Sequence, residues 1–116
     1  MKLTQEQLDA VAIKDDHTGV KAFLDSEVIG RVDVEEDFQD NTAIFSMEVE
    51  PDYRRNGIGM RMIQRLHEIY GKLVPPPTIG PNAVTDEGAR LINKAIDSGF
   101  VHPWPHTVNE YEDEEL

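Results

Sequence analysis

The most informative segment of the sequence is VEPDYRRNGIGMRMIQRL, residues 49–66. An apolar, strand-like run ends at Pro51, two arginines and two glycines follow, and apolar residues then return at helical spacing. Gly57 and Gly59 lack a Cβ atom, so a ligand can approach the backbone there. Because the first turn of a helix has unpaired N–H groups and a partial positive charge, a strand, a glycine loop and a helix in this order are typical of an anion site.

The charges of the chain are segregated around this loop. The protein has 116 residues and a formal net charge of -12. Residues 25–52 contain ten acids and one base, whereas residues 54–72 contain five bases and one acid. The bases near the glycine loop that can attract an anion are Arg54, Arg55, Arg61 and Arg65. Since duplex binding needs a broad basic face, we expect no nucleic acid partner.

The composition predicts one small, cytoplasmic domain. We expect residues 1–108 to form a single domain and residues 109–116 to form an acidic, disordered tail. The chain contains no cysteine, which excludes a disulfide scaffold, a thiol nucleophile and a thiolate metal site. It shows neither a signal peptide nor a run of about 20 apolar residues, so we expect no membrane partner.

Local patterns predict the order of helices and strands. Thr4 and Gln7 form a capping box at the start of the first helix, and Thr85 caps the last one. Alternating polarity predicts three consecutive strands, which form an antiparallel meander. The expected strands lie at residues 20–25, 28–35, 43–49 and 100–104, and the expected helices at residues 3–12, 58–70 and 86–98. Residues 12–19 are predicted to be a connector.

Two well-known phosphate motifs do not fit the glycine loop. Gly-x-Gly-x-x-Gly needs a glycine at the position of Met62, and Gly-x-x-x-x-Gly-Lys-Ser/Thr does not occur in the chain. Nucleoside triphosphates and dinucleotides are therefore disfavoured as ligands.

The string Arg54-x-x-Gly57-x-Gly59, preceded by Val49-x-Pro51, resembles the acyl-CoA-binding signature of the GNAT N-acetyltransferase superfamily, Arg/Gln-x-x-Gly-x-Gly/Ala. TDEGARLINKAIDSGFV, residues 85–101, resembles the later helix of that family and its closing Gly-Phe. The resemblance implies an α+β (α/β) fold. This fold has a mixed sheet with an antiparallel meander, a central glycine-loop helix and a second helix before a C-terminal strand.

The same resemblance implies acetyl-CoA, or another acyl-CoA, as the cofactor. In the family the loop amides hold the pyrophosphate, and the preceding strand pairs with the pantetheine arm. The cofactor-binding residues that it implies are Met47, Val49, Arg54, Arg55, Asn56, Gly57, Ile58, Gly59 and Met60. Backbone N–H groups near Met47 and Val49 would also polarise the thioester carbonyl.

Candidates for proton transfer are few. Acetyl transfer to an amine needs a neutral amine, a polarised thioester and a proton for the departing thiolate. We choose Glu48 as the base, acting directly or through water, with Glu50 second; the alternative is that Glu48 is a solvated strand carboxylate. Family members often use a tyrosine acid four residues before the glycine of the closing Gly-Phe, where this chain has Ala95.

No metal site is expected. His102 and His106 lie on a proline-rich segment that cannot be helical, so their rings start about 13 Å apart along an extended chain. Residues 33–37 begin like a calcium loop. However, Phe38 and Ile44 stand where such a loop requires glycine and glutamate.

Two functions remain open. The first is a GNAT-type N-acyltransferase whose acceptor amine is a cationic small molecule, a protein lysine or a protein N-terminus, attracted by the acidic meander. The second is a noncatalytic GNAT-like domain that acts as an acidic protein-interaction module on a basic protein partner. The chain is short where the family builds its acceptor pocket. That pocket is therefore open to a large substrate, completed by a second subunit in a homodimer, or absent.

Overall fold

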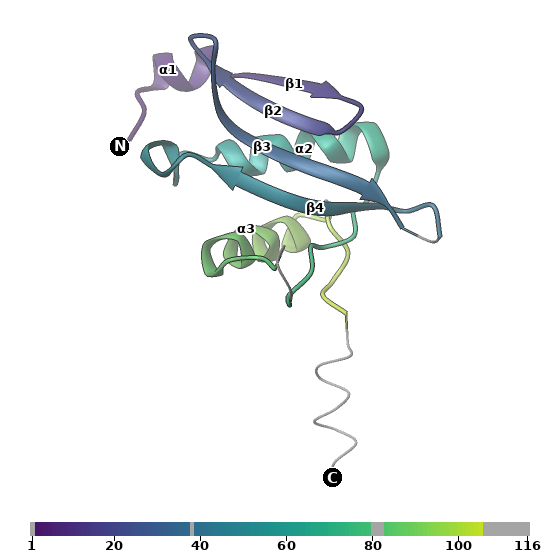
Figure 1. The fold of residues 1–116 in the computed structure, drawn as a ribbon. Helices are drawn as coiled ribbons and strands as arrows, with labels where there is room; N and C mark the ends of the chain where they lie inside the picture. The colour runs from purple at the N-terminus through teal and green to yellow at the C-terminus, as the bar shows by residue number, and fades with distance from the viewer. Residues whose placement is uncertain (1, 38, 80–82, 106–116) are drawn as a thin grey trace.

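The computed structural model describes residues 2–37, 39–79 and 83–105. Four strands pair antiparallel in the order β1-β2-β3-β4, with helices packed against them (Figure 1). The elements are α1 (Gln5–Ala10), β1 (Ala12–Asp16), β2 (Gly19–Leu24), β3 (Glu27–Glu36), β4 (Thr42–Val49), the 3-10 helix η1 (Pro51–Tyr53), α2 (Ile58–Tyr70) and α3 (Asp86–Asp97). The predicted α+β fold class is confirmed. Within the described residues, no helix is long and apolar enough to cross a membrane.

The meander has four strands, not the three predicted. Residues 12–16 were expected to be part of a connector and instead form β1, which pairs with β2 from Ala12–Phe23 to Asp16–Gly19. Lys14, Asp15 and Asp16 are exposed. This strand therefore lacks the alternation of apolar residues by which a strand is recognised in a sequence.

The predicted C-terminal strand at residues 100–104 was wrong in extent. Val101 forms a single parallel bridge with Leu73, whose N–H donates to the Phe100 carbonyl at 3.0 Å. Because Pro103 and Pro105 have no N–H group, the ladder does not continue along this segment. A second parallel bridge, between Ala43 and Val74, joins the segment that contains Leu73 to the start of β4. With these two bridges the pairing is mixed, antiparallel in the meander and parallel beside it.

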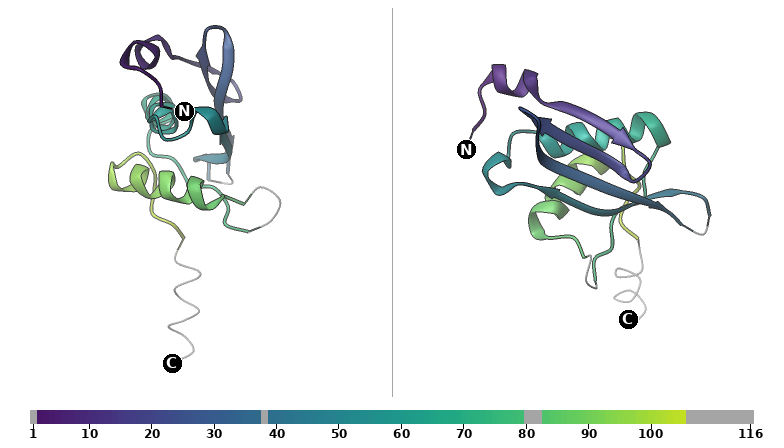
Figure 2. Two further views of the ribbon diagram at one scale, coloured as in Figure 1. Left: turned by 90° about the vertical axis from the view of Figure 1, so that its left-hand side faces the viewer. Right: turned by 45° about the horizontal axis from the view of Figure 1, so that its top comes forward.

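The core lies between α2 and one face of the sheet. Met62, Ile63 and Leu66 of α2 are fully buried, and they pack with residues of the strands such as Val20 and Val32. Figure 2 shows that the opposite face of the sheet is not covered by any helix of the described chain. The helices α2 and α3 therefore lie on one side of the sheet, and α3 adjoins β4, where Gly88 approaches Met47.

Helix α3 packs against α2. Leu91 lies so close to Gly59 that a Cβ atom on this glycine would stand 2.5 Å from the Leu91 Cδ2 atom. At the other end of α3, the rings of Phe100 and His67 lie 5.0 Å apart. The predicted Thr85 cap is confirmed, because its hydroxyl accepts a hydrogen bond from the Gly88 N–H group. These contacts fix α3 along α2 and beside β4.

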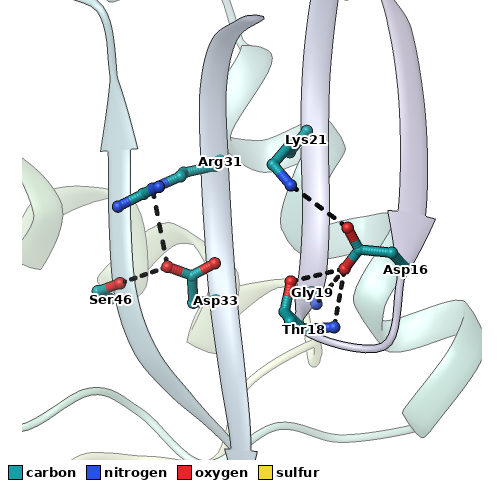
Figure 3. Close-up of polar contacts among 7 residues, drawn as sticks. All are labelled: Asp16, Thr18, Gly19, Lys21, Arg31, Asp33 and Ser46. Carbon is teal, nitrogen blue, oxygen red and sulfur yellow. Dashed lines mark hydrogen bonds and ion pairs between the residues drawn. The ribbon is translucent and has the colours of Figure 1, made fainter.

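Polar contacts organise the uncovered face of the sheet (Figure 3). The Asp16 carboxylate closes the turn between β1 and β2 by accepting hydrogen bonds from the Thr18 hydroxyl at 2.6 Å and the Thr18 N–H group at 2.7 Å. The Thr18 hydroxyl is the main cause that holds the pKa of Asp16 well below its usual range. Asp33 accepts from the Ser46 hydroxyl at 2.9 Å and lies 3.7 Å from Arg31. This second group stands next to the edge of β4.

Arg61 ties α2 to the N-terminal segment. Its Nη1 and Nη2 atoms donate to the carbonyls of Leu8 and Val11, each at 3.0 Å, and these carbonyls belong to the end of α1 and its cap. Arg65, one turn further along α2, pairs with the exposed Asp15 at 2.9 Å.

We expect the Arg61→Met substitution to lower the free energy of unfolding by about 1–3 kcal/mol, because it leaves two partly buried carbonyls without their charged donor. The matched substitution Arg65→Met removes exposed ion pairs and should cost clearly less. Urea unfolding of both variants measures the difference. Equal losses would show that Arg61 is not a structural anchor.

Candidate functional site

A cleft of about 790 Å³ lies between β4, the loop before α2, the first turn of α2 and α3. The sheet contributes Met47, Glu48 and Val49 to its wall, and α3 contributes the face that carries Gly88 and Leu91. Beyond its bridge to residue 74, the outer edge of β4 has no strand beside it in the described chain.

The first turn of α2 faces this cleft without a side-chain cap. Gly57 is its N-cap residue and adopts the left-handed conformation, with φ 79° and ψ 7°, and no side chain accepts a hydrogen bond from this turn. Arg55 also has a positive φ, 65°, which is unusual for a residue with a side chain. The turn contains no acidic residue. The N–H groups at residues 58–60 therefore remain available to an anion.

Helix α3 begins in the same cleft with the opposite chemistry. Thr85 caps its N-terminus, and Asp86 and Glu87 lie in its first turn. The side-chain cap and the two carboxylates occupy the positions where an anion would bind. Of these two helix starts, the first turn of α2 is the one suited to an anion.

The two glycines of the loop have different structural reasons. A Cβ atom on Gly57 would meet nothing within 4 Å, so lack of space is not the reason for a glycine here. The reason is the left-handed backbone, which residues with a side chain rarely adopt. Gly59 is required by the close packing of α2 on Leu91. Packing thus gives Gly59 a structural reason of its own, and the expectation that both glycines serve the approach of a ligand stays a prediction.

The backbone of β4 presents hydrogen-bonding groups to the cleft. The Glu50 N–H group donates to the Ile29 carbonyl of β3 at 2.8 Å. Because backbone groups alternate between the two edges of a strand, those of Met47 and Val49 point away from β3. The Val49 carbonyl indeed accepts a hydrogen bond from the Arg54 Nε atom at 2.8 Å. An extended amide chain could pair with this edge as an added strand would.

Positive charge is concentrated in the cleft of a strongly acidic protein. Among the described residues, five bases and two acids line it. The bases are Arg31, Arg54, Arg55, Arg90 and Lys94, and the acids are Glu48 and Glu87. The Arg54 guanidinium lies 3.9 Å from Glu87, and both side chains are substantially exposed. This arrangement favours a ligand with more than one negative charge.

The structure brings most of the predicted site residues to the cleft. Those that line it are Met47, Glu48, Val49, Arg54, Arg55, Gly57, Ile58, Gly59 and Met60. Asn56 is not among the lining residues; its side chain accepts from the Leu3 N–H group at 2.9 Å and donates to the Tyr53 carbonyl at 3.0 Å. Arg61 and Arg65 of the predicted basic patch make the structural contacts described above and do not line the cleft.

Sequence reasoning missed three of the bases. Arg31 lies on β3, directly across from Glu48 of β4. Arg90 and Lys94 stand four residues apart on α3, which predicts that they share a helix face. No short-range sequence pattern predicts that this face lies opposite the glycine loop, because the packing of α3 on α2 brings it there.

Few side chains that line the cleft can accept or donate a proton. Glu48 is exposed beside Met47 and Val49, whereas Glu50 is not among the residues that line the cleft. Ala95, at the family's tyrosine position, is fully buried in the core. Tyr53 does line the cleft, and burial of its phenol, with Glu27 and Asp52 nearby, raises the pKa of this hydroxyl above its usual value.

An antiparallel meander whose open edge leads into an uncapped helix start is an α+β arrangement suited to binding an anion. The model of the acetyltransferase (GNAT) family matches residues 2–73, more than half of the chain, and the protein belongs to this family. Searches of curated proteins and of solved structures gave no match. The matched region contains the whole meander, the glycine loop and α2, while α3 lies beyond it. Members of the family are acyl-CoA-dependent acyltransferases.

Glu87 lies 3.9 Å from the Arg54 guanidinium and would compete with an anion for this cation. We expect the Glu87→Gln substitution to tighten the binding of inorganic pyrophosphate about two- to fivefold, because it frees the guanidinium and removes a negative charge. Glu68→Gln is the matched control, since Glu68 pairs with Arg65 outside the cleft at 3.3 Å. Calorimetric titration measures both. Unchanged or weaker binding by Glu87→Gln would argue against an anion beside Arg54.

Proposed function

We propose that the protein is an N-acyltransferase that transfers an acetyl group from acetyl-CoA to an amine. The observation that carries this proposal is the first turn of α2, which has neither cap nor acid and faces a basic cleft at the open edge of β4. Membership of the GNAT family supports acyl-CoA as the ligand class. The acidic composition of the rest of the chain makes this basic cleft hard to explain by chance.

The residues of the cleft fit the parts of this cofactor. The N–H groups of Ile58, Gly59 and Met60, with Arg54 and Arg55, would hold the pyrophosphate. The backbone groups of Met47 and Val49 would pair with the amides of the pantetheine arm and polarise the thioester carbonyl. When bound, the cofactor supplies the activated acyl group.

Glu48 takes the proton that the attacking amine loses, directly or through one water molecule. Its place on β4, between Met47 and Val49, puts it at the edge along which the cofactor arm would lie. Arg31 lies directly across from it on β3. The alternative for Glu48, a solvated strand carboxylate without a role in transfer, is decided by the substitution described below.

The acceptor is an amine with free access to the sheet. In the described chain no helix covers the face of the sheet on which Arg31 and Asp33 lie. A protein lysine or a protein N-terminus can therefore approach as easily as a small cationic amine. We also infer a cytoplasmic location from the absence of cysteine.

A second candidate is a noncatalytic GNAT-like domain that binds a basic protein partner or a second copy of itself. The burial of Ala95, at the position where the family often has its acid, favours this reading. A noncatalytic domain would bind acyl-CoA without turnover or would not bind it. An assay of acetyl transfer therefore distinguishes it from the acyltransferase.

Calorimetric titration with acetyl-CoA tests the binding step. We expect micromolar affinity in the native chain and at least a tenfold loss in the double variant Arg54→Ala/Gly57→Glu, which removes a cation and places an acid in the anion site. Arg65→Ala controls for the loss of one positive charge outside the cleft. Absence of binding at millimolar acetyl-CoA would contradict the proposed function.

Glu48→Gln tests the proton transfer. With polyamine, lysine-peptide and peptide N-terminal acceptors, we expect kcat/KM to fall by about 100-fold while the affinity for acetyl-CoA is unchanged. Glu50→Gln, two residues along, should retain nearly full activity. Equal activity of the native chain and Glu48→Gln would remove Glu48 from the mechanism.

A further inference from the structure

The proposed binding mode leaves two bases of the cleft without a role. Arg90 and Lys94 line the cleft and are exposed, and within the described chain neither makes a hydrogen bond or an ion pair. They lie one turn apart on α3, separated by about 6 Å along its axis. Like charges at this spacing repel and slightly destabilise a helix, unless an anion lies between them.

The position of the pair relates it to the glycine loop. Glu87, one turn before Arg90, lies 3.9 Å from Arg54, and Leu91 packs on Gly59 of the first turn of α2. The two bases therefore begin beside the anion site of α2 and continue along the α3 wall. A ligand that places one phosphate group on α2 can reach them with a second one.

The pair also points away from the end of the cleft where the thioester would lie. On α3, Gly88 is the residue that approaches β4, since a Cβ atom there would stand 2.9 Å from the Met47 Cε atom. A helix turns by about 100° per residue, so Arg90 is about 160° and Lys94 about 120° around the axis from Gly88. A charged acyl group beside Met47 would therefore not meet them.

We propose that Arg90 and Lys94 form a subsite for the ribose 3′-phosphate of coenzyme A, which makes the protein selective for the 3′-phosphorylated cofactor. This inference rests on the proposed function, because it assumes an acyl-CoA in the cleft. Coenzyme A carries two separate anionic groups, a pyrophosphate and a phosphate monoester on the ribose. The first fits the amides of α2, and the second is left for the α3 wall. There the guanidinium of Arg90 can donate two hydrogen bonds and Lys94 adds a point charge.

Calorimetric titration with coenzyme A and with 3′-dephospho-coenzyme A tests the subsite. The variant is Arg90→Gln/Lys94→Gln, which removes both charges and leaves polar side chains of similar helix propensity. The control is Arg65→Gln/Lys72→Gln, which removes the same two charges from residues that do not line the cleft. All variants are first compared by urea unfolding.

We expect the native chain and the control to bind coenzyme A about 10- to 100-fold more tightly than the dephospho form. The Arg90→Gln/Lys94→Gln variant should lose this preference to within about twofold, entirely through weaker binding of coenzyme A. Its unchanged affinity for dephospho-coenzyme A would show that the cleft is intact.

Three results would overturn the subsite. The native chain could bind both ligands equally, the variant could keep the preference, or the variant could lose affinity for both ligands by the same factor. If the native chain bound neither ligand, the proposed function itself would fall, and the subsite with it. If the native chain binds the dephospho form, the proposed function stands even when the subsite for the 3′-phosphate fails.

Discussion

Helix α3 packs on the first turn of α2 through the contact between Leu91 and Gly59, and the cleft lies between these two helices and β4. A Cβ atom at position 59 would stand 2.5 Å from the end of the Leu91 side chain, so that side chain would have to shift. With α3 in place, its N-terminus adjoins the loop, and Gly88 approaches Met47 of β4. The cleft therefore has three walls: the open strand edge, the uncapped helix start and the basic face of α3.

The cleft is lined mainly by positive side chains, whereas the molecule as a whole is negative. A protein with a net charge of -12 repels a polyanionic ligand at long range, so affinity has to come from groups at contact distance. Backbone N–H groups serve this purpose well, because the fold orients them and they do not titrate. Arg31, Arg54, Arg55, Arg90 and Lys94 add mobile charge around them. Glu87, which lies 3.9 Å from the Arg54 guanidinium, offsets part of that charge.

The sequence predicts those features that are encoded locally and leaves out those created by tertiary packing. The capping box of Thr4, the cap of Thr85 and the loop before α2 depend on neighbours within a few residues, and the structure has all three. Strand β1 escaped prediction because hydrogen bonds to β2, and not an apolar pattern, hold its exposed residues. Asn56 seemed to belong to the ligand site from its position in the loop. Its side chain instead fastens the N-terminal segment through Leu3, a partner 53 residues away.

The two halves of an acyl transfer are supported here by different kinds of structure. The proposed cofactor binding uses mainly backbone groups, those at the edge of β4 and in the first turn of α2. The proposed proton transfer uses one exposed carboxylate, Glu48, since the buried Ala95 stands at the position of the family's tyrosine. Holding the amine next to the thioester can by itself contribute a large share of the rate. The proposed enzyme, with many groups for the cofactor and one carboxylate for the proton, is therefore expected to bind its cofactor firmly and to turn over slowly.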